Sequence, residues 1–416
     1  QPRSRGLGDV YKRQIIHTIE EHGFKAYAVG GCIRDSILGR NPDDWDITTS
    51  AVPSQIKTFF KRTVDTGIAH GTVTIMIDKT GYEVTTYRID GEYEDGRHPK
   101  SVEFSDRLVD DLCRRDFTIN AMAYNDTDGF VDEFKGLDDL DTKIIRCVGE
   151  PELRFTEDAL RMMRAIRFSA QLGFTIDEAT WNAIKKLSPS ISKISMERVH
   201  VELGKTLMSA HPDYVAQYSE AGLFAPILPV IDNALKSRYK RKILATLQHT
   251  PDNIYLRYAA LFITSTPDEA AKTLRALKLD NKTVNTVSKL VELSKMDIEE
   301  TEPAVRTALN KYGRDFLTLW HELMMAVIQA SEDITGISNP AKVKHLLTLK
   351  RLGTDILARG DCFTIKDLDI SGNDLIEYGL QGHEIGETLK SLLDIVIENP
   401  KLNDKATLIA MIEHIK

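Results

Sequence analysis

The sequence lacks a long apolar stretch, paired cysteines and any sign of a secretion signal. No apolar run in the 416 residues approaches the roughly 20 residues that span a bilayer, and no signal-peptide pattern is present. The cysteines form no CxxC pair and predict buried free thiols in a reducing cytosol; they are Cys32, Cys113, Cys147 and Cys362. A cytoplasmic protein is therefore expected, with no membrane partner.

The sequence also lacks an excess of positive charge, short-period repeats and low-complexity tracts. A net charge of −8 does not by itself indicate a nucleic-acid partner. A local basic surface would suffice, because distant acids are screened beyond about 10 Å. The 42% hydrophobic content supports proper cores, and the length predicts about two to four folding units.

The first 14 residues stand apart from the rest. Residues 9–14 read DVYKRQ, which is the translation of a common sequencing transposon end. Residues 1–14 are therefore predicted to be a non-native leader, with the start of the first native helix missing.

An acid pair follows a glycine turn. Asp44 and Asp46 lie two residues apart, so on a strand both carboxylates would face the same side. Such acids repel each other unless a cation lies between them, and hard oxygen ligands favour Mg²⁺. Residues 27–29 predict a strand, Gly30–Gly31 a tight turn and residues 32–38 a helix, whose N–H groups favour an anion. Together they indicate nucleotidyl transfer with two metal ions, although each alone also fits a surface acid pair or an ordinary turn.

The pattern of elements predicts an α+β fold. Runs 71–77 and 82–88 are rich in β-branched residues and predict a hairpin that turns at residues 79–81. Residues 90–100 are polar and predict a mobile loop. From about residue 150 the period is helical to the end, and residues 157–172 predict one long amphipathic helix. A head with a small mixed sheet and helices should therefore precede an all-helical remainder.

Five motifs in order closely resemble the bacterial class II tRNA nucleotidyltransferases, which comprise the CCA-adding enzymes and their poly(A) polymerase relatives. The motifs are GGCIRD…DDWDIT (30–48), HGTVTI…YEVTTYR (70–88), CRRDFTINAMA (113–123), EDALRMMRAIRF (157–168) and SMERVHVEL (195–203). The resemblance is strong over about residues 15–210 and thin beyond. It implies a seahorse fold with a nucleotidyltransferase head (15–142), a nucleotide-selecting neck (143–201), a helical body (202–300) and a tRNA-binding helical tail (301–416).

The resemblance also assigns site residues. It makes Asp44 and Asp46 the catalytic residues, holding two Mg²⁺ ions that activate the RNA 3′-hydroxyl and bind the triphosphate, with release of pyrophosphate. The implied nucleotide-binding residues are Gly31, Arg34, Arg115, Asp158, Arg161, Arg164 and Arg167, supported by Gly30, Asp116, Asn120 and Glu157. Residues 114–116 also fit a solvated charge cluster. Glu83 is either a third metal carboxylate or a strand acid satisfied by an arginine.

Base selection can be argued from the neck residues themselves. On a helix, Asp158 and Arg161 would be neighbours, with Glu157 placed to hold the arginine. A carboxylate accepts and a guanidinium donates, which matches the amino group and ring nitrogen of cytosine and adenine. Uracil and guanine have the opposite polarity and would leave a buried group unsatisfied, at roughly 1–3 kcal/mol. An ordinary surface ion pair is the alternative.

The rest of the chain bears on tRNA binding and on the choice of family member. Two basic clusters predict phosphate contacts, or else are solvated helix faces; they are Lys236, Arg238, Lys240, Arg241 and Lys242, and Lys342, Lys344, His345, Lys350 and Arg351. The full-length loop with Glu94, Asp95, Arg97 and His98 favours CCA addition over CC addition, and A addition stays open. An end at residues 413–416 without a basic extension lowers the poly(A) polymerase alternative.

The expected substrates are tRNA, CTP and ATP, with no obligate protein partner. Residues 259–265 and 278–283 contain no His-Asp metal-ligand pair, which predicts no phosphohydrolase activity. A nucleotidyltransferase acting on a small molecule and an inactive RNA-binding protein are the remote alternatives.

Overall fold

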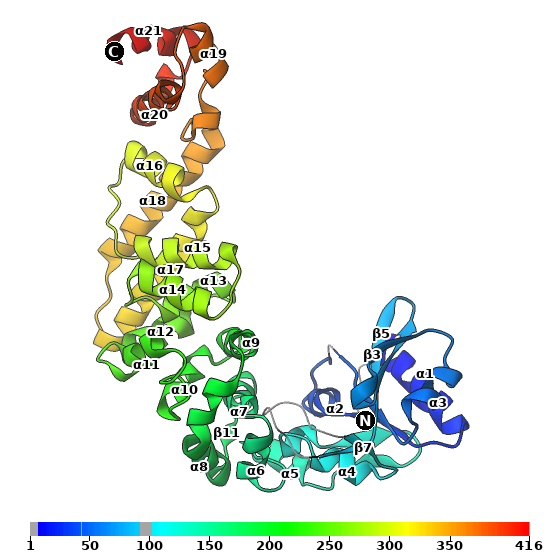
Figure 1. Ribbon diagram of the computed structural model, residues 1–416. Coiled ribbons are helices and arrows are strands. Elements are labelled where there is room, and N and C mark those ends of the chain that lie inside the picture. Colours follow the sequence, from blue (N-terminus) through cyan, green and yellow to red (C-terminus); the bar gives the residue numbers. More distant parts are fainter. Residues whose placement is uncertain (1–6, 43, 92–101, 416) are drawn as a thin grey trace. The chain divides into compact units, whose positions relative to one another are not determined.

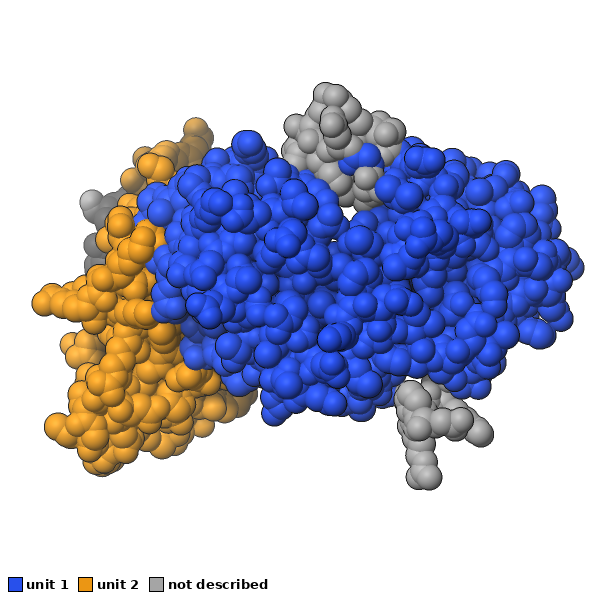
Figure 2. Space-filling view, turned by 90° about the horizontal axis from the view of Figure 1, so that it is seen from below, with its two compact units in different colours: residues 1–229 blue, residues 230–416 orange. Residues whose placement is uncertain are grey.

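The computed structural model describes residues 7–42, 44–91 and 102–415 of the chain (Figure 1). It separates into one unit of residues 1–229 and a second of residues 230–416, which Figure 2 shows in different colours. The finer boundaries at residues 142, 201 and 300 stay predictions. Among the described helices, none has the length and apolar character needed to cross a membrane.

A mixed sheet forms the head of the first unit, in the order β3-β4-β5-β2-β1-β8-β9. The strands are β1 (Ala26–Val29), β2 (Ile47–Thr49), β3 (Thr63–Gly67), β4 (Thr72–Ile77), β5 (Thr80–Thr86), β8 (Ala123–Asn125) and β9 (Gly129–Val131). β2 and β5 run parallel, with Ile47 opposite Val84, whereas β1 is antiparallel to both β2 and β8. This register places Glu83 of β5 beside the residue that precedes β2, which is Asp46.

Two short ladders add to the main sheet. β6 (Arg88–Asp90) pairs with β7 (Val102–Phe104), and β10 (Ile144–Ile145) pairs in parallel with β11 (Thr175–Ile176). β11 lies beyond residue 150, so a short strand interrupts the part of the chain that was predicted to be entirely helical. The predicted α+β class with a mixed-sheet head and helices after it is confirmed.

Helices flank the sheet and then replace it in the first unit. They are α1 (Leu7–Glu21), α2 (Gly31–Ile37), α3 (Pro53–Phe59), α4 (Leu108–Cys113), α5 (Gly136–Asp141), α6 (Pro151–Glu157), α7 (Leu160–Leu172), α8 (Glu178–Leu187), α9 (Met196–Leu207) and α10 (Ala216–Glu220). The head core joins β1, α4 and the segment after it through buried Val29, Leu112 and Ala121. α7 and α9 lie side by side, and both bury apolar faces, including Ile166 and Leu203.

The second unit consists of helices in the part of the chain that the structure describes. They are α11 (Pro229–Lys236), α12 (Lys240–His249), α13 (Ile254–Leu261), α14 (Pro267–Ala276), α15 (Asn281–Leu293), α16 (Glu302–Tyr312), α17 (Phe316–Thr335), α18 (Pro340–Arg359), α19 (Gly372–Glu377), α20 (His383–Glu398) and α21 (Lys405–Ile415). Side-chain oxygens of Thr266, Asp280, Thr301 and Asn339 accept from backbone N–H groups at the starts of α14, α15, α16 and α18. These caps satisfy donors that a helix start leaves free.

Several local expectations need correction. The hairpin turns at Asp78–Lys79, both with positive φ, because the two strands pair as far as Ile77 and Thr80. Cys113 is exposed, whereas the other cysteines are buried as expected. The loop at residues 92–100, with Glu94, Asp95, Arg97 and His98, lies outside the described residues.

Residues 7–14, set aside as a leader, take part in the fold. They form the first turns of α1, in which Lys12 is buried with its ammonium 4.0 Å from the ring centroid of Trp45. Tyr11 donates a hydrogen bond of 2.5 Å to Asp78 Oδ2. The helix continues from an amphipathic segment into this stretch, so its exclusion from the fold was wrong, while its non-native origin stays a prediction.

Candidate active site

Three carboxylates gather where β2 begins. Asp46 directly precedes the strand, Asp44 lies two residues earlier and Glu83 lies beside Asp46 on β5. Loss of hydrating water raises the pKa of Asp46, the positive charge of Arg115 lowers it and the negative charge of Asp44 raises it. Loss of water also raises the pKa of Glu83, and the charges of Asp46 and Asp44 add to this shift. The three acids therefore share a negative field that a cation would relieve.

The local backbone differs from the strand that the sequence predicts. Asp44 and Asp46 lie in an irregular segment before β2, so alternation along a strand does not orient them. The Asp46 carbonyl accepts from the Val29 N–H at 3.0 Å and ties this segment to the end of β1. The same end of β1 leads into Gly30, which brings the acid pair next to the glycine turn.

The glycine turn has the predicted form. Gly30 has a φ of 82° and precedes α2, and the Gly30 N–H donates to the Met122 carbonyl at 3.2 Å. A Cβ on Gly30 would lie 3.0 Å from Arg115 Nη1 and 4.0 Å from Asp46 Oδ2. Glycine suits this position because the backbone has a positive φ and because an added Cβ would require the guanidinium to shift.

Arg115 is held in this corner by an acid that the sequence reading did not single out. Asp111 is fully buried in α4, and its carboxylate accepts from Arg115 Nη2 at 3.1 Å, from Arg114 Nη2 at 2.7 Å and from Thr48 Oγ1 at 3.1 Å. Burial acts to raise the pKa of Asp111, but the Arg115 and Arg114 charges outweigh it and the pKa is lowered. Among the residues that the structure describes, none accepts a hydrogen bond from the buried Arg115 Nε. An anion beside Gly30 would instead meet Nη1 of the same guanidinium.

Asn120 connects Arg34 to Asp116. Arg34 Nη1 donates to Asn120 Oδ1 at 2.6 Å, and Asn120 Nδ2 donates to Asp116 Oδ1 at 3.2 Å. Arg34 also forms two hydrogen bonds with Asp35, at 2.9 and 3.0 Å. The Arg34 guanidinium is thus pre-positioned within α2 by the motif that contains Asp116.

Arg161 links the neck to the head motif. Its Nη1 donates to Glu157 Oε2 at 2.5 Å and to the Arg154 carbonyl at 3.2 Å, and its Nη2 donates to the Arg114 carbonyl at 3.0 Å. The predicted contact between Glu157 and Arg161 is confirmed. Because Arg114 precedes Arg115, these contacts continue from α7 to the corner that contains Asp46.

Asp158 does not lie on a continuous helix with Arg161. The chain breaks between α6 and α7, and Asp158 has an extended backbone with φ −143° and ψ 105°. Its Oδ1 accepts from the Leu160 N–H at 3.0 Å, and its Oδ2 accepts from Arg198 Nη2 at 2.7 Å. The expectation that Asp158 and Arg161 lie on one helix was therefore wrong, because Asp158 ends α6 with an extended backbone, whereas Arg161 lies in the first turn of α7. That their side chains lie side by side stays a prediction.

Arg164 and Arg167 join the head to α9. Arg164 Nε donates to Asp116 Oδ2 at 2.8 Å, and Arg167 Nε donates to the buried Glu202 at 2.5 Å. Both guanidinium groups, together with that of Arg34, lie 3.9 to 5.4 Å from the ring centroid of Phe168. Arg167 is thus an interior residue here, and its contact with nucleotide stays a prediction.

The basic clusters in the second unit are partly engaged. Lys236 pairs with Asp232 at 2.8 Å, and His345 lies 2.8 Å from Glu300. Arg351 is 67% exposed at its side chain and lies on α18 with Lys344, which is also exposed. Phosphate binding and solvation therefore both remain compatible with these faces.

The acid pair fits a divalent cation that is bound together with substrate. In the described residues, no group of three or more His, Cys, Asp and Glu is arranged to hold a metal ion. Mg²⁺ at phosphate-handling sites takes one or two carboxylates and completes its shell with water and substrate oxygens. Loss of water, and to a smaller extent the neighbouring acids, raise the pKa values of Asp46 and Glu83, and a cation bound there would favour their ionised forms.

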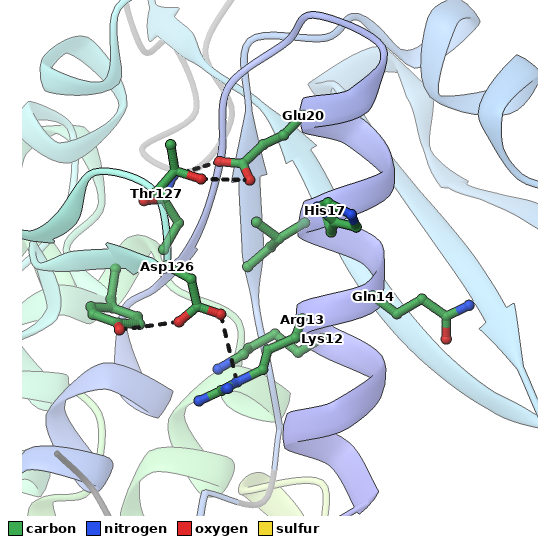
Figure 3. Close-up of a pocket in the computed structure, with 10 residues that line it drawn as sticks. Lys12, Arg13, Gln14, His17, Glu20, Asp126 and Thr127 are labelled. Carbon is green, nitrogen blue, oxygen red and sulfur yellow. Dashed lines mark hydrogen bonds and ion pairs between the residues drawn. The ribbon is translucent and has the colours of Figure 1, made fainter.

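A separate pocket of about 460 Å³ lies between α1 and the β8–β9 turn (Figure 3). Asp126 lies 3.8 Å from Arg13 and accepts from Tyr124 at 3.1 Å, while Thr127 donates to Glu20 at 3.0 Å. Its lining contains neither the acid pair nor the neck residues, so the candidate site is identified by chemistry and not by cavity size.

The sequence reading missed Asp111, Arg198 and Glu202 as contributors. Asp111 precedes Arg114 and Arg115 by three and four residues, a helical spacing that pairs opposite charges. Arg198 and Glu202 both lie in the motif SMERVHVEL, which carried the resemblance without assigned roles. Their partners lie 40 and 35 residues away, so spacing alone gives no signal for them.

Family profiles and known proteins agree with this architecture. Residues 26–146 match the poly A polymerase head domain, 173–235 a probable RNA and SrmB-binding site of polymerase A, and 252–412 a putative tRNA nucleotidyltransferase domain 2. CCA-adding enzymes of Pediococcus pentosaceus and Limosilactobacillus fermentum are 34% and 37% identical to the chain; they align over 95% of the chain in both cases and over 96% and 94% of their own lengths.

A solved structure of a CCA-adding enzyme also matches the chain. The crystal structure of the Bacillus stearothermophilus CCA-adding enzyme in complex with CTP is 31% identical, with a TM-score of 0.76 and 98% coverage of both chains. The nucleotidyltransferase fold in turn implies a requirement for divalent metal. The sheet-containing head with its acid pair, the helical remainder and these full-length relatives place the chain in the CCA-adding enzyme family of class II tRNA nucleotidyltransferases.

Proposed function

We propose that this protein adds C, C and A in turn to the 3′ end of tRNA, using CTP and ATP without a nucleic-acid template. Membership of the family over 95% of the chain supports the reaction class. The structural observation that supports it most directly is the corner shared by Asp46, Gly30 and Arg115, in which a Cβ on Gly30 would lie 3.0 Å from the guanidinium and 4.0 Å from the carboxylate. It combines negative charge for cations with a guanidinium for a triphosphate.

Asp44 and Asp46 are proposed to hold two Mg²⁺ ions. When bound, these ions would make the RNA 3′-hydroxyl a better nucleophile and neutralise the triphosphate. Arg115, fixed by Asp111, would donate to phosphate oxygens through Nη1, the atom that lies beside Gly30. Gly30 and Gly31 allow the chain to approach the nucleotide closely, and Arg34 is held ready by Asn120.

Asp158 and Arg161 are proposed to read the base. Counting the partners in the described parts of the chain, Asp158 keeps a lone pair on each carboxylate oxygen for the amino group of cytosine or adenine. Arg161 has further N–H donors beyond those given to Glu157 and to backbone carbonyls. The pair can then serve both bases without a template, even though the two residues are held by different partners. Arg164 and Arg167 supply positive charge next to this site.

The exposed basic residues of α11, α12 and α18 are proposed to contact tRNA phosphates, and the cytoplasm is the expected location. The choice between CCA and A addition depends on the loop at residues 92–100, which lies outside the described residues. No structural observation favours the small-molecule or inactive alternatives.

The test is incorporation of each labelled nucleoside triphosphate into tRNA transcripts that end before the first C, the second C or the final A. CTP should label the first two transcripts and ATP the third, and UTP and GTP should label none. Labelling by ATP alone on a tRNA that ends in CC would refute CCA addition and identify an A-adding enzyme.

A further inference from the structure

The aromatic ring of Phe168 contacts three guanidinium groups in the first unit. The Cζ atoms of Arg34, Arg164 and Arg167 lie over this ring, at 5.0, 5.4 and 3.9 Å from its centroid. A cation over an aromatic face within about 6 Å is attracted by the ring quadrupole, and more strongly where water is excluded. Phe168 is only 5% exposed. The three contacts therefore lie largely out of water, where such an attraction counts most.

Phe168 also connects the glycine turn to the neck. Arg34 belongs to α2, whereas Phe168 belongs to α7. A Cβ on Gly31 would lie 3.6 Å from Arg34 Nη2, so this guanidinium stands beside the glycine turn. The hydrogen bonds of Arg34 go to Asp35 and Asn120, both outside α7. The ring thus adds a contact between the arginine of the turn and α7.

A shared ring suits arginines that must also bind a ligand. Burial lowers the pKa of Arg167, and the positive charge of Arg164 adds to this effect while Glu202 opposes it. A carboxylate that relieves such strain takes up N–H donors, whereas the face of a ring takes up none. Arg164 gives Nε and Nη2 to Asp116, and its side chain is still 34% exposed. The ring therefore stabilises these cations and leaves their remaining donors for an anion.

The plane of the Phe168 ring is fixed by a second aromatic residue. The fully buried Phe117, in the head motif, forms an edge-to-face contact with it, with 5.7 Å between centroids and 80° between planes. An aliphatic side chain could fill the same space but would present no electron-rich face to the cations. Packing alone would therefore not require an aromatic residue here.

We propose that Phe168 is a positioning residue for the nucleoside triphosphate: its ring holds the guanidinium groups of Arg34 and Arg164 in place, so that their remaining N–H groups donate to phosphate oxygens. This inference rests on the proposed function of the same site. CTP and ATP carry the same triphosphate, so the ring should affect the binding of both and leave the choice of base unchanged. The loss of a buried cation–π contact corresponds to about a tenfold change in affinity.

Phenylalanines with one, two or three ring fluorines, incorporated at position 168, test this contact at nearly constant ring size. Each fluorine withdraws electrons from the ring face and weakens its attraction for cations. We expect the Kd for CTP and for ATP, measured by titration of the RNA-free protein, to rise stepwise by about tenfold in total. In single-nucleotide incorporation, KM should rise in the same steps with a smaller change in kcat, and kcat/KM for UTP relative to CTP should stay constant.

The same fluorinated residues at position 224 are the matched control. Phe224 is fully buried in the same unit, and its ring lies 5.0 Å from that of Tyr218, an uncharged partner. This series should leave both Kd values unchanged and report any loss of stability that fluorine itself causes. Phe168→Leu, which keeps an apolar side chain, should bind CTP and ATP as weakly as the trifluoro variant.

Equal Kd values across the Phe168 series overturn the inference, as does a fall in melting temperature without a change in Kd, because both describe a residue that only packs. A Kd that rises in Phe168→Leu but not with added fluorine overturns it as well. A stepwise rise in Kd in a protein that adds neither C nor A contradicts the proposed function and not the role of the ring.

Discussion

Arg164 donates to Asp116 across the junction of α7 and the head motif, with 2.8 Å between Nε and Oδ2. Asp116 is buried, which acts to raise its pKa, but the charges of Arg164 and Arg161 outweigh this and hold the pKa well below its usual range. A contact of this strength couples the acid of one motif to the arginines of another. Removal of this contact should lower the free energy of unfolding.

Asp116→Asn should lower the free energy of unfolding at pH 7 by about 2–3 kcal/mol, the range for a hydrogen bond between charged groups. Because the folded-state pKa lies below the ordinary 3.8, the carboxylate contributes fully above that value. The contribution is lost as pH falls through the folded pKa, so the gap between wild type and variant should narrow below about pH 4. Urea unfolding at a series of pH values, with hydrogen exchange of α7 peptides, measures the difference in unfolding free energy between the wild type and the variant. A difference that stays constant down to the lowest pH would contradict a stabilising role of the ionised Asp116.

Asp44→Ala and Asp46→Ala should each reduce nucleotide incorporation by about a thousandfold or more, the equivalent of about 4 kcal/mol of transition-state stabilisation. Binding of tRNA should stay nearly intact, because these side chains are not among the proposed RNA contacts. Addition of EDTA to the wild type should have the same effect on incorporation. Asp65→Asn, which removes an exposed acid paired with Lys57, is the control and should retain full activity. Substantial incorporation by either alanine variant would refute the metal site.

Glu83→Gln tests whether the third carboxylate belongs to the metal site. If the negative charge of Glu83 helps to bind the cations, the Mg²⁺ concentration for half-maximal activity should be about three- to fivefold higher in Glu83→Gln than in the wild type at neutral pH. As pH decreases, wild-type activity should begin to fall at a higher pH than it would with carboxyl groups of ordinary pKa, because the pKa values of Asp46 and Glu83 are raised. Removal of Glu83 should shift this acid limb to lower pH. An unchanged metal requirement and acid limb would show that Glu83 only borders the site.

Asp158→Ala should relax base choice, because it removes the proposed hydrogen-bond acceptor for the amino group of the base. We expect incorporation of UTP to approach that of CTP to within about tenfold. Competition between labelled CTP and unlabelled UTP measures the ratio directly. Discrimination against UTP that is equal to that of the wild type would refute the reading by Asp158 and Arg161.

The double variant Lys344→Ala with Arg351→Ala tests the basic face of α18. If each residue neutralises a phosphate, the slope of log K for tRNA against log salt should fall by about 0.7–0.9 for each of the two substitutions. Filter binding at several salt concentrations gives the slope. Lys61→Ala removes an exposed lysine of the head outside the two clusters and serves as the control. A double variant with the wild-type slope identifies a solvated face.

Local sequence rules predicted those parts of the site that depend on local geometry. The strand, glycine turn and short helix at residues 26–37 follow from turn chemistry. The Glu157–Arg161 contact was predicted from helical spacing and does form, although the helix breaks between the two residues. The extent of the β4–β5 hairpin was also predictable, although its turn lies at Asp78–Lys79. These features are fixed by neighbours in the chain.

Features that depend on distant partners were not accessible in the same way. The break at Asp158 carries no glycine or proline, and the apolar period runs through it. The aspartate did offer one signal, because an acid at a helix start accepts from backbone N–H groups. The ion pair with Arg198 depends on the packing of α7 against α9, and the proximity of Glu83 to Asp46 depends on the β2–β5 register. Neither is encoded in a short window of sequence.

The absence of a side chain at Gly30 makes this corner sensitive to substitution. Every amino-acid replacement of glycine introduces a Cβ, which here would meet a guanidinium at 3.0 Å on a backbone with φ +82°. Any coding change at codon 30 therefore has to be met by a strained backbone and by a shift of the Arg115 guanidinium, so this corner constrains the evolution of the gene.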